Sequence, residues 1–114
     1  MVVDDDPRDA RGIKLMLRGH GVDIALDASA ALERLAEGTY DLILCDVVMP
    51  EVDGLDLLQA LTAKHPDAVE RLVFLTGAAS DPMHRDRLID SGRPVYAKPT
   101  SKSALNRLID EWVT

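Results

Sequence analysis

The segment at residues 42–45 (LILC) constrains the fold of this chain most, because it is continuously apolar and leads directly into Asp46. A strand with one face in water alternates apolar and polar residues, whereas an unbroken apolar strand is buried on both faces. Burial on both faces requires a covering layer on each side of the sheet. Pro50 and Gly54 then indicate a turn, so Asp46 is predicted to lie at the carboxyl end of this strand.

Strand-like and helix-like segments alternate along the whole chain. The predicted strands are residues 1–3, 22–26, 41–46, 72–75 and 94–97. The predicted helices run from Pro7 toward Gly19, over residues 30–37, 55–64 and 83–90, and from about Ser101 onward. Strands separated by helices imply a parallel sheet with helices on both faces, joined by right-handed crossovers. We therefore predict one α/β domain over residues 1–114, built as a doubly wound five-stranded parallel sheet.

Composition narrows the classes of partner and the location. A formal net charge of −7 disfavours binding to nucleic acid or to an anionic membrane surface, because either would require an excess of Lys and Arg. No apolar run reaches the roughly 20 residues that span a bilayer. Cys45 is the single cysteine and lies within the apolar strand, so it is expected to be a small buried residue in a reducing compartment. We therefore expect a cytoplasmic protein.

Polar and charged residues stand at the ends of four of the predicted strands. They are Asp4 and Asp5 after the first, Asp46 after the third, Thr76 after the fourth and Lys98 after the fifth. Because parallel strands place their carboxyl ends on one edge of the sheet, where ligands bind in open α/β folds, these groups are expected to converge.

The convergent residues suggest phosphoryl transfer. Carboxylates about 4 Å apart repel one another by roughly 4 kcal/mol per pair at an effective dielectric near 20. A hard divalent cation would relieve this repulsion, and a ligand set made only of oxygen atoms favours magnesium. Thr76 and Lys98 could each bind an oxygen of a phosphoryl group, while an aspartate can itself be the nucleophile and form an acyl phosphate. Asp46 is the predicted acceptor.

Four motifs in order, "VVDDDP", "CDVVMPEVDG", "VFLTGA" and "YAKP", resemble those of the receiver domain of two-component response regulators. The likeness covers the whole chain. It implies a flavodoxin-like (βα)5 fold with strand order 2-1-3-4-5. It also implies Mg²⁺-dependent transfer from a phosphohistidine of a histidine kinase or a histidine phosphotransfer domain. Such a domain catalyses only its own phosphorylation and dephosphorylation, so it is not expected to be an enzyme acting on an external substrate.

The resemblance also assigns the metal site. It makes Asp46 the phosphoacceptor and a magnesium ligand, together with Asp5 and the backbone carbonyl of Val48. Asp4 would support the metal, largely through water. In the family, the acidic pair is followed by one residue and then by proline, so Asp4 and Asp5 are the pair here and Asp6 is the residue before Pro7. Asp6 is expected instead to cap the following helix.

The same resemblance makes Thr76 the switch hydroxyl and Lys98 the phosphate partner, with a cis bond between Lys98 and Pro99. One departure from the family pattern concerns the switch. The family usually has an aromatic residue three positions before the lysine, where this chain has Val95. Tyr96 is one position out of step, so strand alternation is expected to turn it to the other face.

Several alternatives remain open. An aspartate-nucleophile phosphohydrolase needs a second Asp two residues after the nucleophile, where this chain has Val48. A flavin-binding module of the same topology needs a phosphate-binding loop after the first strand, where this chain has three aspartates. A receiver retained mainly for docking is a third alternative, against which the complete set of site residues argues. Whether the domain stands alone, belongs to a hybrid histidine kinase or forms a homodimer is also left open.

Overall fold

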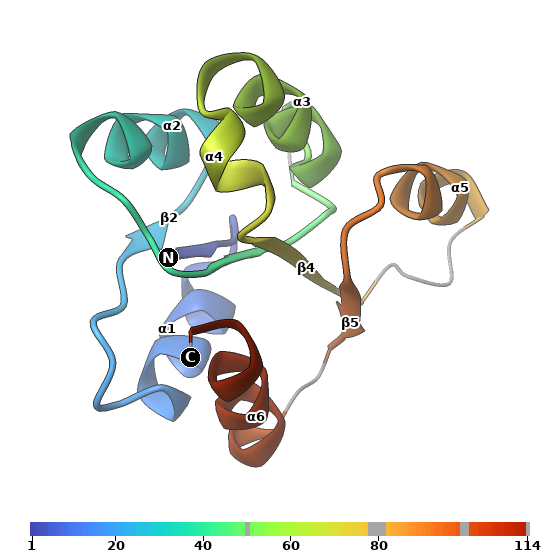
Figure 1. Ribbon diagram of the computed structural model, residues 1–114. Coiled ribbons are helices and arrows are strands. Elements are labelled where there is room, and N and C mark those ends of the chain that lie inside the picture. The colour runs from blue at the N-terminus through green and yellow to red at the C-terminus, as the bar shows by residue number, and fades with distance from the viewer. Residues whose placement is uncertain (50, 78–81, 99–100, 114) are drawn as a thin grey trace.

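A parallel sheet between two layers of helices forms the core of the computed structural model (Figure 1). The structure describes residues 1–49, 51–77, 82–98 and 101–113. The strands are β1 (Val2–Val3), β2 (Ile24–Ala25), β3 (Ile43–Cys45), β4 (Leu72–Thr76) and β5 (Val95–Ala97). They pair in the order β2-β1-β3-β4-β5, and every pairing is parallel. The predicted α/β fold and strand order are therefore confirmed.

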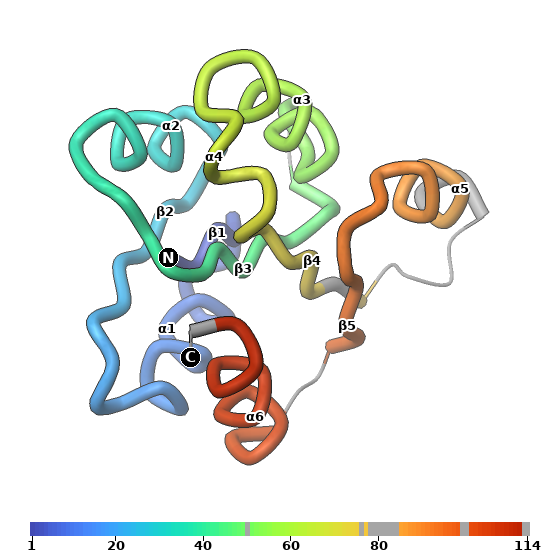
Figure 2. Tube along the Cα trace, viewed as in Figure 1, coloured from blue at the N-terminus to red at the C-terminus, as the bar shows by residue number. Residues whose placement is uncertain are grey.

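Helices cover both faces of the sheet. They are α1 (Pro7–Met16), α2 (Ala28–Glu37), α3 (Gly54–Lys64), α4 (Pro66–Val69), α5 (Pro82–Asp90) and α6 (Lys102–Val113). Figure 1 shows α1 and α6 below the sheet, α2, α3 and α4 above it, and α5 near β5. In the tube view, the labelled N-terminus lies at the start of β1 and faces the viewer, at the edge where the strands begin (Figure 2).

The central strand β3 contributes to both halves of the hydrophobic core. Ile43 and Cys45 are fully buried in the half that includes residues of α2 and α3. Leu44 faces the other half, which includes residues of α1 and α6. The continuous apolar run is thus a strand with a helical layer on each side, as predicted.

Some elements differ from the predicted bounds. The strand predicted at residues 22–26 is paired only at Ile24 and Ala25, because its neighbour β1 has just two residues to pair with it. The helix α4 was not predicted, since His65 and Pro66 suggested only an end to α3. Pro66 instead begins a new helical turn, a position where its missing N–H leaves no hydrogen bond unmade.

Aspartate side chains define where three helices begin. Asp6 caps α1 by accepting a hydrogen bond from the Arg8 N–H at 2.9 Å, which confirms its predicted capping role. Asp27 caps α2 in the same way, so this helix begins at Ala28 rather than at residue 30. Asp53 caps α3 and forms a reciprocal capping box with the next aspartate in the helix.

Gly54 lets α3 begin directly against the chain segment that follows β3. Its N–H donates to the Val47 carbonyl at 2.8 Å. A Cβ atom at position 54 would overlap the Asp46 carbonyl oxygen and would lie 3.1 Å from both the Phe74 ring and Val47 Cα. Only glycine fits this approach without a shift of the backbone, so Gly54 helps to fix the position of Asp46.

This packing predicts opposite effects for two glycine substitutions. Gly54→Ala should lower the free energy of unfolding by about 1–3 kcal/mol, as expected when an added atom must displace its neighbours. The matched control is Gly12→Ala in α1, where an added Cβ meets no atom within 4 Å. This change should stabilise the protein by about 0.5–1 kcal/mol, because Ala loses less backbone entropy in a helix. Urea unfolding of both variants would test the pair, and similar shifts for both would contradict the packing argument.

Candidate functional site

Three carboxylates meet at the carboxyl edge of the sheet. Asp4 and Asp5 follow β1, and Asp46 follows the neighbouring strand β3. One carboxylate oxygen from each of these residues lies within 4.8 Å of the others. The Asp46 N–H donates to the Val3 carbonyl at 2.8 Å, so the ladder between β1 and β3 holds the two strand ends in register. The structure therefore brings together the aspartates that the sequence placed at this edge.

Lys98, which follows β5, supplies a cation to the cluster. Its Nζ lies 2.6 Å from Asp4 Oδ2 and 3.4 Å from Asp46 Oδ2. Burial lowers the pKa of Lys98. The hydrogen bond to Asp4 and the charges of the nearby carboxylates raise the pKa by more than burial lowers it, so the pKa lies above its ordinary value. The ammonium group is therefore charged at neutral pH and offsets part of the repulsion between the carboxylates.

Asp4 and Asp5 occupy different environments although they are adjacent in sequence. Asp4 is buried, and both of its oxygens already accept hydrogen bonds: Oδ1 from the Asp6 N–H at 3.0 Å and Oδ2 from Lys98. These contacts provide the pairing that a buried carboxylate requires. Asp5 is exposed and accepts no hydrogen bond from another described residue. Asp4 is thus held in place, whereas Asp5 is available to an added ligand.

Asp46 is partly withdrawn from water, with 13% of its side chain exposed. Burial raises the pKa of Asp46 and the charge of Asp4 raises it further, while Lys98 opposes both effects. The net shift is upward. The preceding residue, Cys45, is fully buried, and burial raises the pKa of its thiol so that it remains protonated. Of these two neighbouring side chains, that of Asp46 is therefore the one that a ligand can reach from solvent.

The two remaining predicted site residues, Val48 and Thr76, are located here by their positions in the backbone. Val48 lies in the segment between β3 and α3, with its side chain about half exposed. Thr76 is the last residue of β4 and pairs in register with Ala97, so it stands one strand from Lys98 and one residue out of line with it. The Thr76 side chain and Pro99 lie outside the described part of the chain, and so does the predicted cis bond.

Val95 and Tyr96 lie on opposite faces of β5, as the strand alternation predicted. Val95 pairs with Phe74 and packs against the half of the core that includes residues of α3. Tyr96 pairs with Leu75 and is 39% exposed on the other face. The position three residues before Lys98 is therefore filled by a small aliphatic side chain.

The sequence analysis missed one charged residue at the site. Asp9 Oδ2 lies 3.5 Å from Lys98 Nζ, so Lys98 contacts a third carboxylate in addition to Asp4 and Asp46. The available signal was its position: Asp9 stands three residues after the cap Asp6, in the first turn of α1. That turn begins next to the carboxylate cluster.

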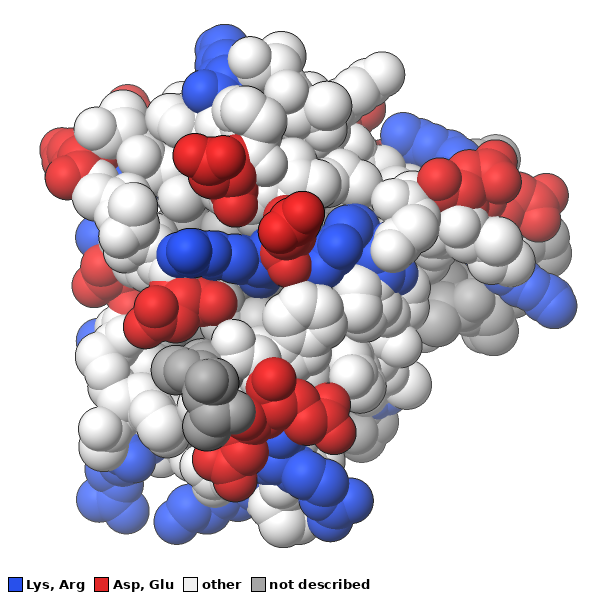
Figure 3. Space-filling model, in the orientation of Figure 1, with Lys and Arg blue, Asp and Glu red and all other residues white. Residues whose placement is uncertain are grey.

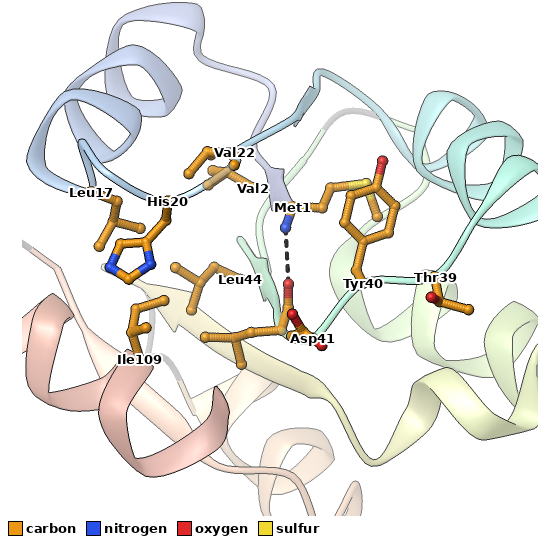
Figure 4. Close-up of a pocket in the computed structure, with 12 residues that line it drawn as sticks. Met1, Val2, Leu17, His20, Val22, Thr39, Tyr40, Asp41, Leu44 and Ile109 are labelled. Atoms are coloured by element: carbon orange, nitrogen blue, oxygen red, sulfur yellow. Dashed lines mark hydrogen bonds between the residues drawn. The ribbon is translucent and has the colours of Figure 1, made fainter. Parts of the chain in front are cut away.

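A separate pocket of about 270 Å³ lies at the opposite edge of the sheet (Figure 4). There the Met1 amino group donates to the Leu42 carbonyl at 2.9 Å, and burial lowers the pKa of this amino group to about 6. Acidic and basic side chains are interspersed over this face of the molecule (Figure 3). None of the residues that line this pocket belongs to the carboxylate cluster. In the part of the chain that the structure describes, no helix combines the length and apolarity needed to cross a bilayer.

Comparison with known proteins gives a consistent set of matches. A family profile described as the response regulator receiver domain matches residues 1–110. Sensor kinase CckA of Brucella abortus is 35% identical over 114 residues, which cover 97% of this chain and 12% of that protein. Aerobic respiration control sensor protein ArcB of Escherichia coli is 35% identical over 96 residues, which cover 82% of this chain and 12% of that protein. The chain thus spans about 12% of the length of these relatives.

Solved structures of similar shape agree with these matches. The receiver domain of the Francisella response regulator 1452 is 29% identical, with a TM-score of 0.77 over 97% of this chain and 92% of that one. The signal receiver domain of a histidine kinase from Syntrophus aciditrophicus is 27% identical, with a TM-score of 0.84 over 98% of this chain and 86% of that one.

Because the pKa of Asp46 is raised, we predict that ionisation of Asp46 lowers the free energy of unfolding when no divalent cation is present. A carboxyl group whose native pKa lies above its ordinary value of 3.8 stabilises the fold while protonated and loses that contribution as the pH rises through the native pKa. At pH 7, Asp46→Asn should therefore raise the free energy of unfolding, by up to about 1 kcal/mol for a partly exposed charge. Urea unfolding without magnesium would measure the difference, which should shrink as the pH is lowered toward the ordinary Asp value. A variant less stable than the wild type at pH 7 would contradict the prediction.

Proposed function

The chain belongs to the response regulator receiver domain family, and from that premise we propose that Asp46 is the residue that accepts the phosphoryl group. Receiver domains are the phosphoacceptor domains of two-component signalling. The observation that carries the assignment is the position of Asp46 at the end of a buried central strand, beside Lys98 and the carboxylates of Asp4 and Asp5. We take residues 1–114 as the extent of the domain.

In the proposed reaction, a carboxylate oxygen of Asp46 attacks the phosphorus atom of a phosphohistidine. The new bond is an acyl phosphate P–O bond, and the P–N bond to the imidazole breaks as the ring nitrogen leaves with the bonding electrons. Lys98 is proposed to pair with a phosphoryl oxygen, because its Nζ is already within 3.4 Å of Asp46 Oδ2. The hydroxyl of Thr76 is the proposed second partner, from the end of β4. Asp46 must be deprotonated to react.

The residues at this edge fit a magnesium ion. Two unit charges of like sign about 5 Å apart repel by roughly 3 kcal/mol at an effective dielectric near 20. Three carboxylates lie within 4.8 Å of one another here, and Lys98 is the one ammonium group that pairs with any of them among the described residues. We propose that Asp5, Asp46 and the Val48 carbonyl would hold the ion. Asp4 would act largely through water, since both of its oxygens already accept hydrogen bonds. When bound, magnesium would neutralise negative charge on the carboxylates and on the phosphoryl oxygens.

The proposed partner is a histidine kinase or a histidine phosphotransfer domain, the class of protein that carries a phosphohistidine. CckA and ArcB, which this chain resembles, are named as sensor proteins, so a place within a hybrid histidine kinase is consistent with the comparisons. We further propose a cytoplasmic location, because the buried Cys45 suits a reducing compartment.

We also infer that the domain turns over no external substrate. An aspartate-nucleophile phosphohydrolase requires an acid two residues after the nucleophile, and the Val48 side chain has no proton to donate. The first strand is followed by three aspartates, which would repel the phosphate of a flavin cofactor. The cluster of site residues likewise favours a phosphoacceptor over a module retained only for docking.

Phosphorylation of Asp46 can be tested directly. The protein incubated with magnesium and acetyl phosphate should gain the mass of one phosphoryl group, and Asp46→Asn should gain none. Asp53→Asn is the matched control, because Asp53 is a nearby aspartate that contacts Arg87 rather than Lys98 and because Asn preserves its capping role. Phosphorylation of the Asp46→Asn variant to the wild-type level would refute the assignment.

Magnesium binding should depend on Asp5 and not on Asp6. Asp5→Asn should weaken binding at least about tenfold, since even outer-shell partners of a metal typically contribute about 10–100-fold. Asp6→Asn removes the same charge from the next residue but keeps the α1 cap, so its affinity should stay close to that of the wild type. Calorimetric titration of both variants would measure the difference. Equal losses would show that the metal-binding pair is misplaced.

A further inference from the structure

The first turn of α1 places a carboxylate beside Lys98 that lies outside the proposed phosphoacceptor and metal site. Asp9 Oδ2 is 3.5 Å from Lys98 Nζ, almost the same distance as Asp46 Oδ2 at 3.4 Å. The Asp9 side chain is 53% exposed, whereas Asp4, at 2.6 Å from Lys98, is buried. Lys98 is therefore shared among three carboxylates, of which Asp9 is the most accessible to water.

A comparison of two helix N-termini explains why Asp9 reaches Lys98. Both α1 and α3 begin with a capping aspartate followed three residues later by a second aspartate. In α3, the Asp53 N–H donates to Asp56 Oδ2 at 3.2 Å, which closes the capping box.

In α1, by contrast, the Asp6 N–H donates to Asp4 Oδ1 at 3.0 Å. The corresponding donor is thus unavailable to Asp9, and the described partner of the Asp9 carboxylate is Lys98. The buried Asp4 therefore determines the position of Asp9 as well as that of Lys98.

We propose that Asp9 is a positioning residue that holds the Lys98 ammonium toward α1 in the unphosphorylated domain and so competes with a phosphoryl group for it. The inference rests on the proposed function of Asp46. It adds a residue that lowers the affinity of the site for phosphoryl groups and their anionic analogues.

The direction of the effect follows from charge and distance. A phosphoryl group on Asp46 adds negative charge next to Lys98, and Asp9 then opposes it in two ways: it attracts the same ammonium and it repels the added charge. Removal of the Asp9 charge leaves Lys98 bound to Asp4 at 2.6 Å, so the ammonium stays within the site. Because Asp9 is half exposed, water screens its charge and the effect should be about two- to fivefold.

Beryllium fluoride, an anionic mimic of the phosphoryl group, provides the test. Its dissociation constant would be measured by fluorine NMR at a fixed, saturating magnesium concentration. Asp9→Asn should bind it about two- to fivefold more tightly than the wild type. Asp9→Glu keeps the charge and should remain close to the wild type. The control Asp6→Asn removes one charge from the same segment without contact to Lys98 and should also leave the affinity unchanged.

Further readouts separate positioning from a structural role. Asp9 carries negative charge at the N-terminus of α1, so a purely structural role predicts that Asp9→Asn lowers the melting temperature and does not tighten the adduct. The proposed role predicts tighter binding whose advantage over the wild type shrinks as ionic strength rises.

The outcomes are distinct. Unchanged or weaker binding by Asp9→Asn, or equal tightening by Asp6→Asn, would overturn the role of Asp9 while leaving the Asp46 assignment intact. A wild-type protein that forms no adduct at all would instead refute the proposed function, together with the inference that rests on it.

Discussion

The contact between Lys98 and Asp4 is the interaction on which the site depends. It joins residues 94 positions apart in the chain, at the ends of β5 and β1, with Nζ and Oδ2 2.6 Å apart. Asp4 is the buried partner, and removal of the cation beside a buried carboxylate leaves an uncompensated charge that destabilises the fold. The site therefore depends on the fold. A buried carboxylate such as Asp4 needs a cationic partner, and the parallel sheet brings Lys98 to the same edge. The same pair leaves Asp5 accessible to a metal ion and Asp46 within reach of the ammonium group.

The position of Asp46 depends on backbone contacts rather than on its own side chain. Its N–H is fixed by Val3 in the neighbouring strand, and its carbonyl oxygen lies where only a glycine at position 54 can approach. The capping box of α3 then fixes the first turn of the helix that follows. A side chain whose backbone is held in this way has little conformational freedom to lose when a reactant binds, which is the advantage of a site built on strand ends.

The sequence was sufficient for the fold and for the edge where the carboxylates gather, because both follow from local patterns. The unbroken apolar run before Asp46 required two covering layers, and the alternation of strands with helices required parallel pairing. The short strand lengths and the helix α4 did not follow, since they depend on how much of β1 is available for pairing and on how the chain continues after His65. These features are set by tertiary contacts, which local patterns do not encode.

Asp9 and Arg93 show the same limit at the level of single side chains. Asp9 has the sequence context of a capping-box residue, and only the hydrogen bond from the Asp6 N–H to Asp4 turns it toward Lys98. Arg93 donates to two backbone carbonyls before and within β4 and lies 5.6 Å from the centroid of the Trp112 ring, so it joins the start of β5 to α6. The local sequence places Asp9 in the first turn of α1 but predicts neither of these contacts. Both exist because a parallel sheet places the ends of distant strands side by side. The same arrangement explains why the proposed phosphoacceptor Asp46, its neighbour Lys98 and the proposed competitor Asp9 come from three separate parts of the chain.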